Sequence, residues 1–125
     1  TNDAIQQHSE DYGKFESGNK LSINDFQDIG FVAWKFIYKL HERYLPLVEA
    51  LVTDSFRAVI DSIDKERLRN TFELFGYDFM IDENFRVYLI EVNTNPCLEV
   101  CCPLLSRIIP EVIDNTFRIG LDPIF

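Results

Sequence analysis

Two strand-like runs separated by a short polar segment constrain this chain more than any other feature. The first run covers residues 71–81 and is rich in aromatic side chains, and the second covers residues 87–93 and is apolar and rich in β-branched ones. Both compositions favour an extended backbone. The runs are therefore predicted to pair as a β-hairpin.

The predicted register of this hairpin places two acidic residues directly opposite each other. If the loop is symmetric about positions 84–85, Asp78 faces Glu91 and Gly76 faces Asn93. The same register predicts four further pairs: Met80 with Leu89, Ile81 with Tyr88, Phe79 with Ile90, and Tyr77 with Val92. Opposed residues on paired strands have Cβ atoms about 5 Å apart, so the two carboxylates would repel each other.

Two arrangements would relieve this repulsion: a proton shared between the carboxyl groups or a bound divalent cation. Asn93 lies two residues beyond Glu91, so it points to the same side and offers a carbonyl oxygen. Two carboxylates and an amide suit Mg²⁺, which completes its shell with water and substrate phosphates. Gly76 would leave room for a ligand to approach the backbone.

Two structural alternatives remain open for the acid pair. A β-bulge would shift the register and separate Asp78 from Glu91, and a solvated face would accommodate both charges without a metal. Asp82 and Glu83 lie in the predicted turn, and we expect both to be solvated.

Outside the hairpin, the chain is predicted to be an irregular arm followed by helices. Residues 1–28 are polar and interrupted by glycine, asparagine and serine, which indicates a loop. Apolar residues then recur at helical spacing over residues 29–63. We expect two helices there, the first ending near His41 and the second following Pro46, which suits a first-turn position.

The C-terminal part is predicted to be helical over residues 104–119. Pro110 falls inside this pattern, so we expect either a kinked helix or two short ones. The helical pattern ends near Gly120, a residue type that is common just after a helix.

Composition limits the classes of partner. The net charge is −9, with 21 acidic and 12 basic residues, which argues against binding to nucleic acid. No apolar run approaches the roughly 20 residues that a membrane span needs, so no membrane partner is expected. Hydrophobic residues make up 46% of the chain, enough for a hydrophobic core. The three cysteines indicate a reducing compartment and are expected to be ordinary thiols.

Two segments resemble the end of tubulin tyrosine ligase-like proteins. Residues 72–82, Phe-Glu-Leu-Phe-Gly-Tyr-Asp-Phe-Met-Ile-Asp, match that family's apolar-Gly-aromatic-Asp-apolar-Met pattern. Residues 89–98, Leu-Ile-Glu-Val-Asn-Thr-Asn-Pro-Cys-Leu, match its Leu-Ile-Glu-Val-Asn-x-x-Pro pattern. Thr1 and Asn2 resemble the end of the family's Leu-Thr-Asn motif.

The resemblance implies an α+β chain that forms the C-terminal portion of an ATP-grasp fold, with an antiparallel hairpin packed against helices. We expect residues 1–125 to be one partial domain of this kind, with residues 71–93 as a metal-binding hairpin. In the family, the residues that match Asp78, Glu91 and Asn93 hold the magnesium ions that bridge the ATP phosphates. The family's Thr-Asn pair lies near the nucleotide phosphates, which implies a cofactor-binding role for Thr1 and Asn2.

The resemblance also implies an activity. Such ligases use ATP and Mg²⁺ to activate a carboxylate as an acyl phosphate, which an amine then attacks. The expected partners are tubulin or microtubules and an amino acid, with glutamate slightly preferred over glycine or tyrosine. The expected location is the cytoplasm and cytoskeleton, including the cilium. We expect this portion alone to be inactive as an enzyme, and the alternative is a non-catalytic homologue that binds microtubules.

Overall fold

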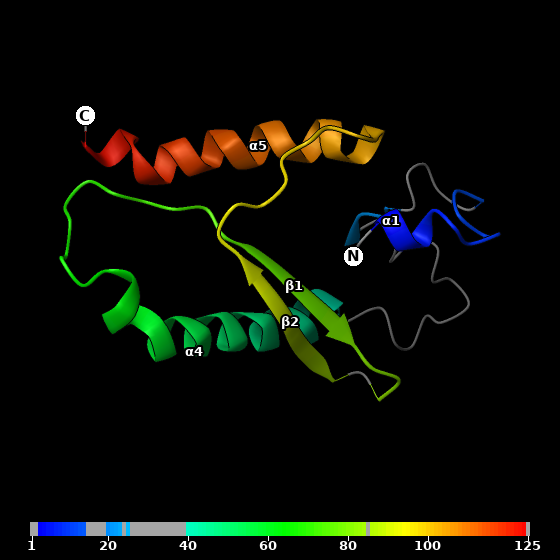
Figure 1. Ribbon diagram of the computed structural model, residues 1–125, viewed down its shortest axis with the longest axis horizontal. Helices are drawn as coiled ribbons and strands as arrows, with labels where there is room; N and C mark the ends of the chain where they lie inside the picture. Colours follow the sequence, from blue (N-terminus) through cyan, green and yellow to red (C-terminus); the bar gives the residue numbers. More distant parts are fainter. Residues whose placement is uncertain (1–2, 15–19, 24, 26–39, 85, 125) are drawn as a thin grey trace. The chain divides into compact units, whose positions relative to one another are not determined.

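The computed structural model describes residues 3–14, 20–23, 25, 40–84 and 86–124, and it combines helices with one two-stranded antiparallel sheet (Figure 1). The elements in chain order are α1 (Asp3–Gln6), the π-helix η3 (Leu40–Tyr44), α4 (Leu45–Ile63), β1 (Gly76–Ile81), β2 (Val87–Asn93), α5 (Pro103–Gly120) and the 3₁₀-helix η4 (Asp122–Ile124). This confirms the predicted α+β class and is consistent with part of an ATP-grasp fold.

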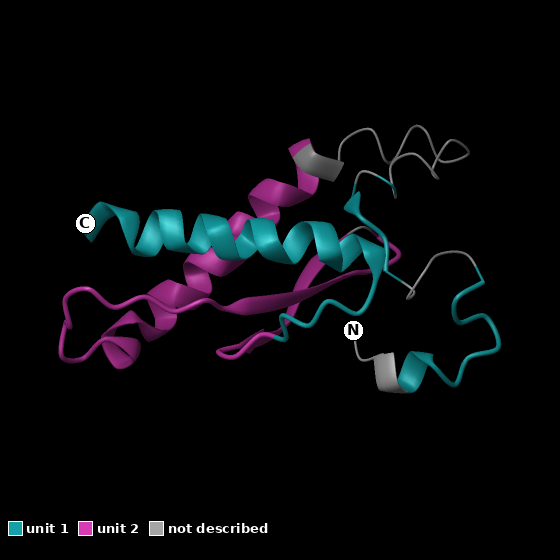
Figure 2. Ribbon diagram, turned by 90° about the horizontal axis from the view of Figure 1, so that it is seen from above, with its two compact units in different colours: residues 1–32, 97–125 teal, residues 33–96 magenta. Residues whose placement is uncertain are grey.

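The chain divides into two compact units, shown in different colours in Figure 2. One unit consists of residues 33–96 and contains α4, β1 and β2. The other joins residues 1–32 to residues 97–125 and contains α1, α5 and η4. The prediction that residues 1–125 form one domain stays a prediction.

Helix α4 has the predicted proline in its first turn. Proline has no backbone N–H to leave unpaired there, and its fixed φ suits a helix start. The chain enters α4 through the π-helical turn η3 and leaves it at Asp64, whose carboxylate accepts a hydrogen bond from the backbone N–H of Leu68 at 3.1 Å. The helix predicted between residue 29 and His41 falls almost entirely outside the described residues.

Strands β1 and β2 pair with the predicted register only at their open end. Gly76 faces Asn93, Tyr77 faces Val92 and Asp78 faces Glu91, as expected. A β-bulge between Asp78 and Phe79 then shifts the ladder, so the other three predicted pairs are wrong. The observed pairs are Phe79 with Leu89, Met80 with Tyr88, and Ile81 with Val87. Ile90 is the extra residue on β2, since two residues of one strand oppose one of the other at a bulge.

The hairpin is also shorter than predicted, because β1 begins at Gly76 rather than at residue 71. The partner strand explains this difference. β2 ends at Asn93, and the chain bends at Thr94 and Asn95 before Pro96. Proline cannot donate a ladder hydrogen bond, so residues before Gly76 find no strand opposite them.

Aromatic side chains of the hairpin pack against α4. The hairpin crosses this helix in Figure 1. The Tyr77 hydroxyl lies 2.8 Å from the Ser55 hydroxyl. The Phe56 ring packs edge-on against Phe75, with centroids 5.4 Å apart, and Tyr77 stacks on Phe79 at 6.0 Å. Because side chains alternate along a strand, Asp78 and Met80 point away from α4.

Little of the described structure is buried. Among the described side chains, only Tyr44 and Cys102 are buried, with exposed fractions of 6% and 8%. Large apolar residues such as Met80 and Ile119 are exposed, at 61% and 79%. The described residues thus show little of the hydrophobic core that the composition predicts, because two strands and the helix that packs on them cannot enclose a core.

Helix α5 is a single helix that contains Pro110, so the alternative of two short helices is wrong. It ends at Gly120, as the sequence indicated. Pro110 removes one helical hydrogen bond, the one that Ser106 would accept. Among the described residues, no helix combines the length and the apolar character that a membrane crossing requires.

Candidate metal site

Asp78 and Glu91 form the centre of the candidate site. They are directly opposite each other on β1 and β2, on the face that points away from α4. Asp78 is half-buried and Glu91 is exposed. Because the bulge lies on the loop side of this pair, the first structural alternative raised by the sequence does not separate the acids. The second alternative, a solvated face, does hold for Glu91, because its side chain is exposed.

Asn93 connects to this pair directly. Its side-chain Nδ2 donates a hydrogen bond to Oε1 of Glu91 at 3.2 Å. An amide N–H held against a carboxylate disperses part of its negative charge. Asp78 faces Glu91 in the ladder, so the three residues are neighbours at the open end of the hairpin. The structure thus brings together all three predicted metal ligands.

This set of ligands fits Mg²⁺, which needs only a few protein ligands. It does not fit a metal ion whose ligands all come from the protein. All three groups offer oxygen, and Mg²⁺ is commonly bound by one or two carboxylates plus water and phosphate oxygens. Among the described residues there is no cluster of three or more histidine, cysteine, aspartate or glutamate side chains placed to hold a metal. A cation at this position would therefore take most of its shell from water or from a bound ligand.

Gly76 has a different role from the one expected. A Cβ added at this position would lie 2.9 Å from the Cβ of Pro96, closer than such atoms approach in proteins. The space beside Gly76 is therefore filled by Pro96 rather than left open for a ligand. Glycine allows the chain that leaves β2 to fold back tightly beside the site.

Asp82 closes the hairpin loop, a role that the sequence reasoning missed. Its Oδ1 accepts hydrogen bonds from the backbone N–H groups of Asn84 at 2.9 Å and Arg86 at 2.8 Å. Both hydrogen bonds lower the pKa of the Asp82 carboxyl, and the one from Arg86 has the largest effect. A hydrogen bond from the Tyr88 hydroxyl lowers this pKa as well. Asp82 is thus a bonded turn residue and not merely a solvated acid. The signal was present, because an aspartate at a turn commonly bonds the backbone two residues on.

The remaining predicted site residues, Thr1 and Asn2, lie outside the described residues. The three cysteines are free thiols, with Cys97 and Cys101 exposed and Cys102 buried.

Comparison with known proteins identifies the family. The sequence matches the Tubulin-tyrosine ligase family over residues 1–124. The chain belongs to this family. The match includes both hairpin strands and therefore all three candidate ligands.

Three relatives illustrate how the similarity is distributed. Tubulin glycylase 3D of Tetrahymena thermophila is 27% identical over 98% of this chain, which corresponds to 12% of that protein. Protein polyglycylase TTLL10 of Rattus norvegicus is 47% identical over 41% of this chain and 8% of its own length. Inactive polyglycylase TTLL10 of Homo sapiens is 45% identical over the same shares. The matched segments thus cover between 8% and 12% of the length of these relatives.

Proposed function

We propose that this chain supplies the magnesium-binding part of an ATP-dependent ligase that joins an amino acid to tubulin. The observation that carries the proposal is the pairing of Asp78 with Glu91, and of Glu91 with Asn93, on the face of the hairpin away from α4. Opposed carboxylates destabilise a strand pair unless they have a partner. Membership of the Tubulin-tyrosine ligase family supports the reaction class.

We propose glycine as the amino acid. The relatives named above are called glycylases or polyglycylases, whereas the family resemblance favoured glutamate slightly. Tubulin is the partner that follows from the name of the Tetrahymena relative and from the name of the family, and the cytoskeleton is the corresponding location in the cytoplasm.

The proposed reaction has two steps. An acceptor carboxylate attacks the γ-phosphorus of ATP, which forms an acyl phosphate and releases ADP. The amine of the incoming amino acid then attacks the acyl carbon, which forms an amide bond and releases phosphate. Mg²⁺ would supply charge neutralisation and alignment of the transferred phosphoryl group.

This chain would contribute positioning to that reaction. Asp78 and Glu91 would hold the cation from two strands, so their separation is set by the ladder and not by flexible loops. Asn93 would hold the Glu91 carboxylate in place through the 3.2 Å hydrogen bond. A site on rigid strands keeps its geometry while the ligand changes.

A second candidate function is a non-catalytic homologue that binds microtubules. One observation favours it: the human relative with 45% identity over 51 residues is named as inactive. Its identity falls within two percentage points of that of the rat polyglycylase over the same length. Similarity in this region therefore does not separate active members from inactive ones.

A ligation assay tests the proposal. The complete protein is incubated with microtubules, Mg-ATP and a mixture of glycine, glutamate and tyrosine, and the tubulin tails are measured by mass spectrometry. The proposal expects increments of glycine that disappear in Glu91→Gln. Increments of another amino acid would overturn the choice of donor. Microtubule binding without any increment or ATP turnover would favour the second candidate.

A further inference from the structure

Pro96 lies on the same face of the hairpin as the candidate metal ligands. Side chains alternate along a strand, so a Cβ at Gly76 would point to the face that carries Asp78. That Cβ would lie 2.9 Å from the Cβ of Pro96. Pro96 is half-buried although it follows the end of β2. The chain that leaves the hairpin therefore turns back over the face of the ligands.

The position of Pro96 affects Asn93 more directly than the other two ligands. Asn93 is the ladder partner of Gly76, and its Cβ would lie 3.8 Å from a Cβ at Gly76. Since glycine has no side chain, the space opposite Asn93 would be open if Pro96 did not occupy it. Filling this space removes rotamers in which the Asn93 amide turns away from Glu91. The amide instead donates its 3.2 Å hydrogen bond to Glu91.

A proline suits this place because the bend before it has few other restraints. Thr94 and Asn95 form the bend and are exposed. Neither side chain forms a hydrogen bond with another described residue. Proline fixes its own φ and restricts the backbone of the residue before it. Pro96 therefore limits the conformations of the bend as well as filling the space beside Gly76.

We propose that Pro96 is a positioning residue for the metal site. It acts through Asn93, whose amide it keeps beside Glu91, and Gly76 is needed because it makes room for Pro96. This inference rests on the proposed metal site and adds a pair of residues beyond its three ligands. Loss of a group that holds a metal ligand in place typically weakens metal binding about 10- to 100-fold.

Binding of Mn²⁺ to the complete protein tests this inference without a catalytic step. Mn²⁺ accepts the same oxygen ligands as Mg²⁺, and its electron paramagnetic resonance signal weakens when the ion is bound. Pro96→Gly removes the Cβ and frees the backbone, so it should raise the dissociation constant of Mn²⁺ about tenfold. Gly76→Ala should also raise it, because the new Cβ displaces Pro96.

The double variant Gly76→Ala/Pro96→Gly separates positioning from a general loss of stability. Without the Cβ of Pro96, the new Cβ at position 76 would meet the Cα of residue 96 at 3.8 Å, an ordinary contact. A methyl group from β1 would then fill the space opposite Asn93. The double variant should therefore bind Mn²⁺ more tightly than either single variant. Losses that add up, or wild-type affinity in Pro96→Gly, would overturn the proposal.

Pro103→Gly is the matched control. It makes the same change at the start of α5, in the unit that holds none of the three candidate metal ligands. Its dissociation constant for Mn²⁺ should equal that of the wild type. A loss as large as that of Pro96→Gly would show a general effect of removing a proline and would overturn the proposal.

Glu91→Gln distinguishes failure of this inference from failure of the metal site. If the wild type binds Mn²⁺ and Glu91→Gln does not, the metal site holds, and the result for Pro96→Gly decides the inference alone. Equal binding by the wild type and Glu91→Gln, or no binding by either, would remove the metal site and the inference with it.

Discussion

The two faces of the β1–β2 hairpin differ in chemistry although they belong to the same strands. The face on α4 carries Tyr77 and Phe79, whose rings stack on each other while Tyr77 bonds Ser55. The opposite face carries Asp78 and Glu91, which face each other with no positive side chain paired to either among the described residues. Side chains that follow each other along a strand point to opposite faces, so these two sets of residues alternate in the sequence of the hairpin.

Because the two sets of residues lie on opposite faces, stability and metal binding are expected to respond to different substitutions. Replacing a residue on the α4 face removes packing or a hydrogen bond, so it should lower the free energy of unfolding. Replacing an acid on the other face removes a repulsion and a candidate ligand, so it should abolish function and leave the fold intact.

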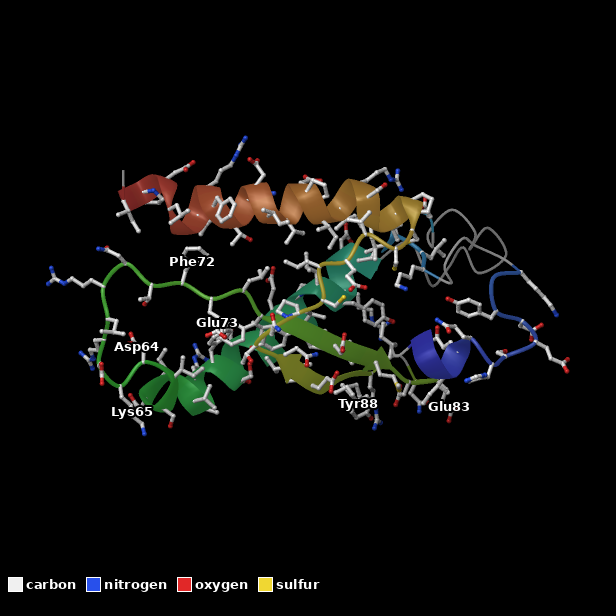
Figure 3. The ribbon with its side chains drawn as sticks, turned by 45° about the horizontal axis from the view of Figure 1, so that its top comes forward. Asp64, Lys65, Phe72, Glu73, Glu83 and Tyr88 are labelled. Atoms are coloured by element: carbon white, nitrogen blue, oxygen red, sulfur yellow. The ribbon has the colours of Figure 1, made fainter. Side chains whose placement is uncertain are left out.

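The largest effect is expected for Asp78→Asn in the ligation assay. Loss of one carboxylate that positions the cation should lower kcat about 10²- to 10³-fold, as when one transition-state donor is removed. Glu83→Gln, an exposed acid of the same hairpin (Figure 3), is the control and should retain full activity. Normal activity in Asp78→Asn would remove the metal assignment.

Gly76→Ala should destabilise the protein although it adds only one methyl group. The new Cβ would meet the Pro96 Cβ at 2.9 Å, and relieving such overpacking typically costs about 1–3 kcal/mol. Chemical denaturation of the wild type and the variant measures this. A variant as stable as the wild type would mean that the chain after β2 moves aside freely.

Ser55→Ala and Tyr77→Phe should each lower the free energy of unfolding by about 0.5–1.5 kcal/mol, since each removes one partner of the 2.8 Å hydrogen bond. A double-mutant cycle tests whether the two losses come from the same bond. If they do, the double variant should lose less than the sum of the single ones. Strict additivity would show that the two hydroxyls act independently.

Without Mg²⁺, Asp78→Asn should be as stable as the wild type or slightly more stable. Opposed like charges on a strand pair cost about 0.2–1 kcal/mol, and the variant removes this cost. Thermal melts in the presence of a chelator provide the comparison. A clear loss of stability would show that Asp78 has a structural role and that the two faces are not separable.

The smallest effect concerns Asp82 and pH. Its pKa is lowered from the usual 3.8 by the hydrogen bonds from Arg86 and Asn84. A carboxyl with a depressed folded-state pKa contributes stability above its unfolded-state pKa, and this contribution is lost as the pH falls through the folded-state value. Melting temperatures below pH 4 should therefore fall less in Asp82→Asn than in the wild type. Parallel curves would contradict this contribution.

The sequence predicted the acid pair from a loop symmetric about positions 84–85, whereas the observed loop pairs Ile81 with Val87 and is centred on Asn84. The extra residue of the bulge compensates for this difference, so Asp78 still faces Glu91. The predicted register is wrong from Phe79 to the loop, because nothing in the pattern shows that Ile90 is the bulged residue. The start of β1 was also wrong, since it depends on where the partner strand ends and not on the composition of residues 71–75. Gly76 was assigned to ligand access, but its contact is with Pro96, which only the folded chain shows.

The helices show the same division between local and non-local information. Pro46 and Gly120 mark a start and an end that local chemistry determines, and both lie where expected. Pro110 does not break α5 into two, because the rest of the pattern outweighs one missing hydrogen bond. Among the described residues few side chains are buried, since composition counts apolar residues without showing which surfaces cover them.

The central claim is that the Asp78–Glu91 pair holds the metal that binds the nucleotide. The most direct measurement is the melting temperature of the complete protein and of Glu91→Gln, each with and without Mg-ATP. A ligand at a hundred times its Kd stabilises the folded state by about 2.7 kcal/mol. The account predicts that Mg-ATP raises the melting temperature of the wild type and leaves that of Glu91→Gln unchanged. An equal rise in both proteins would contradict it.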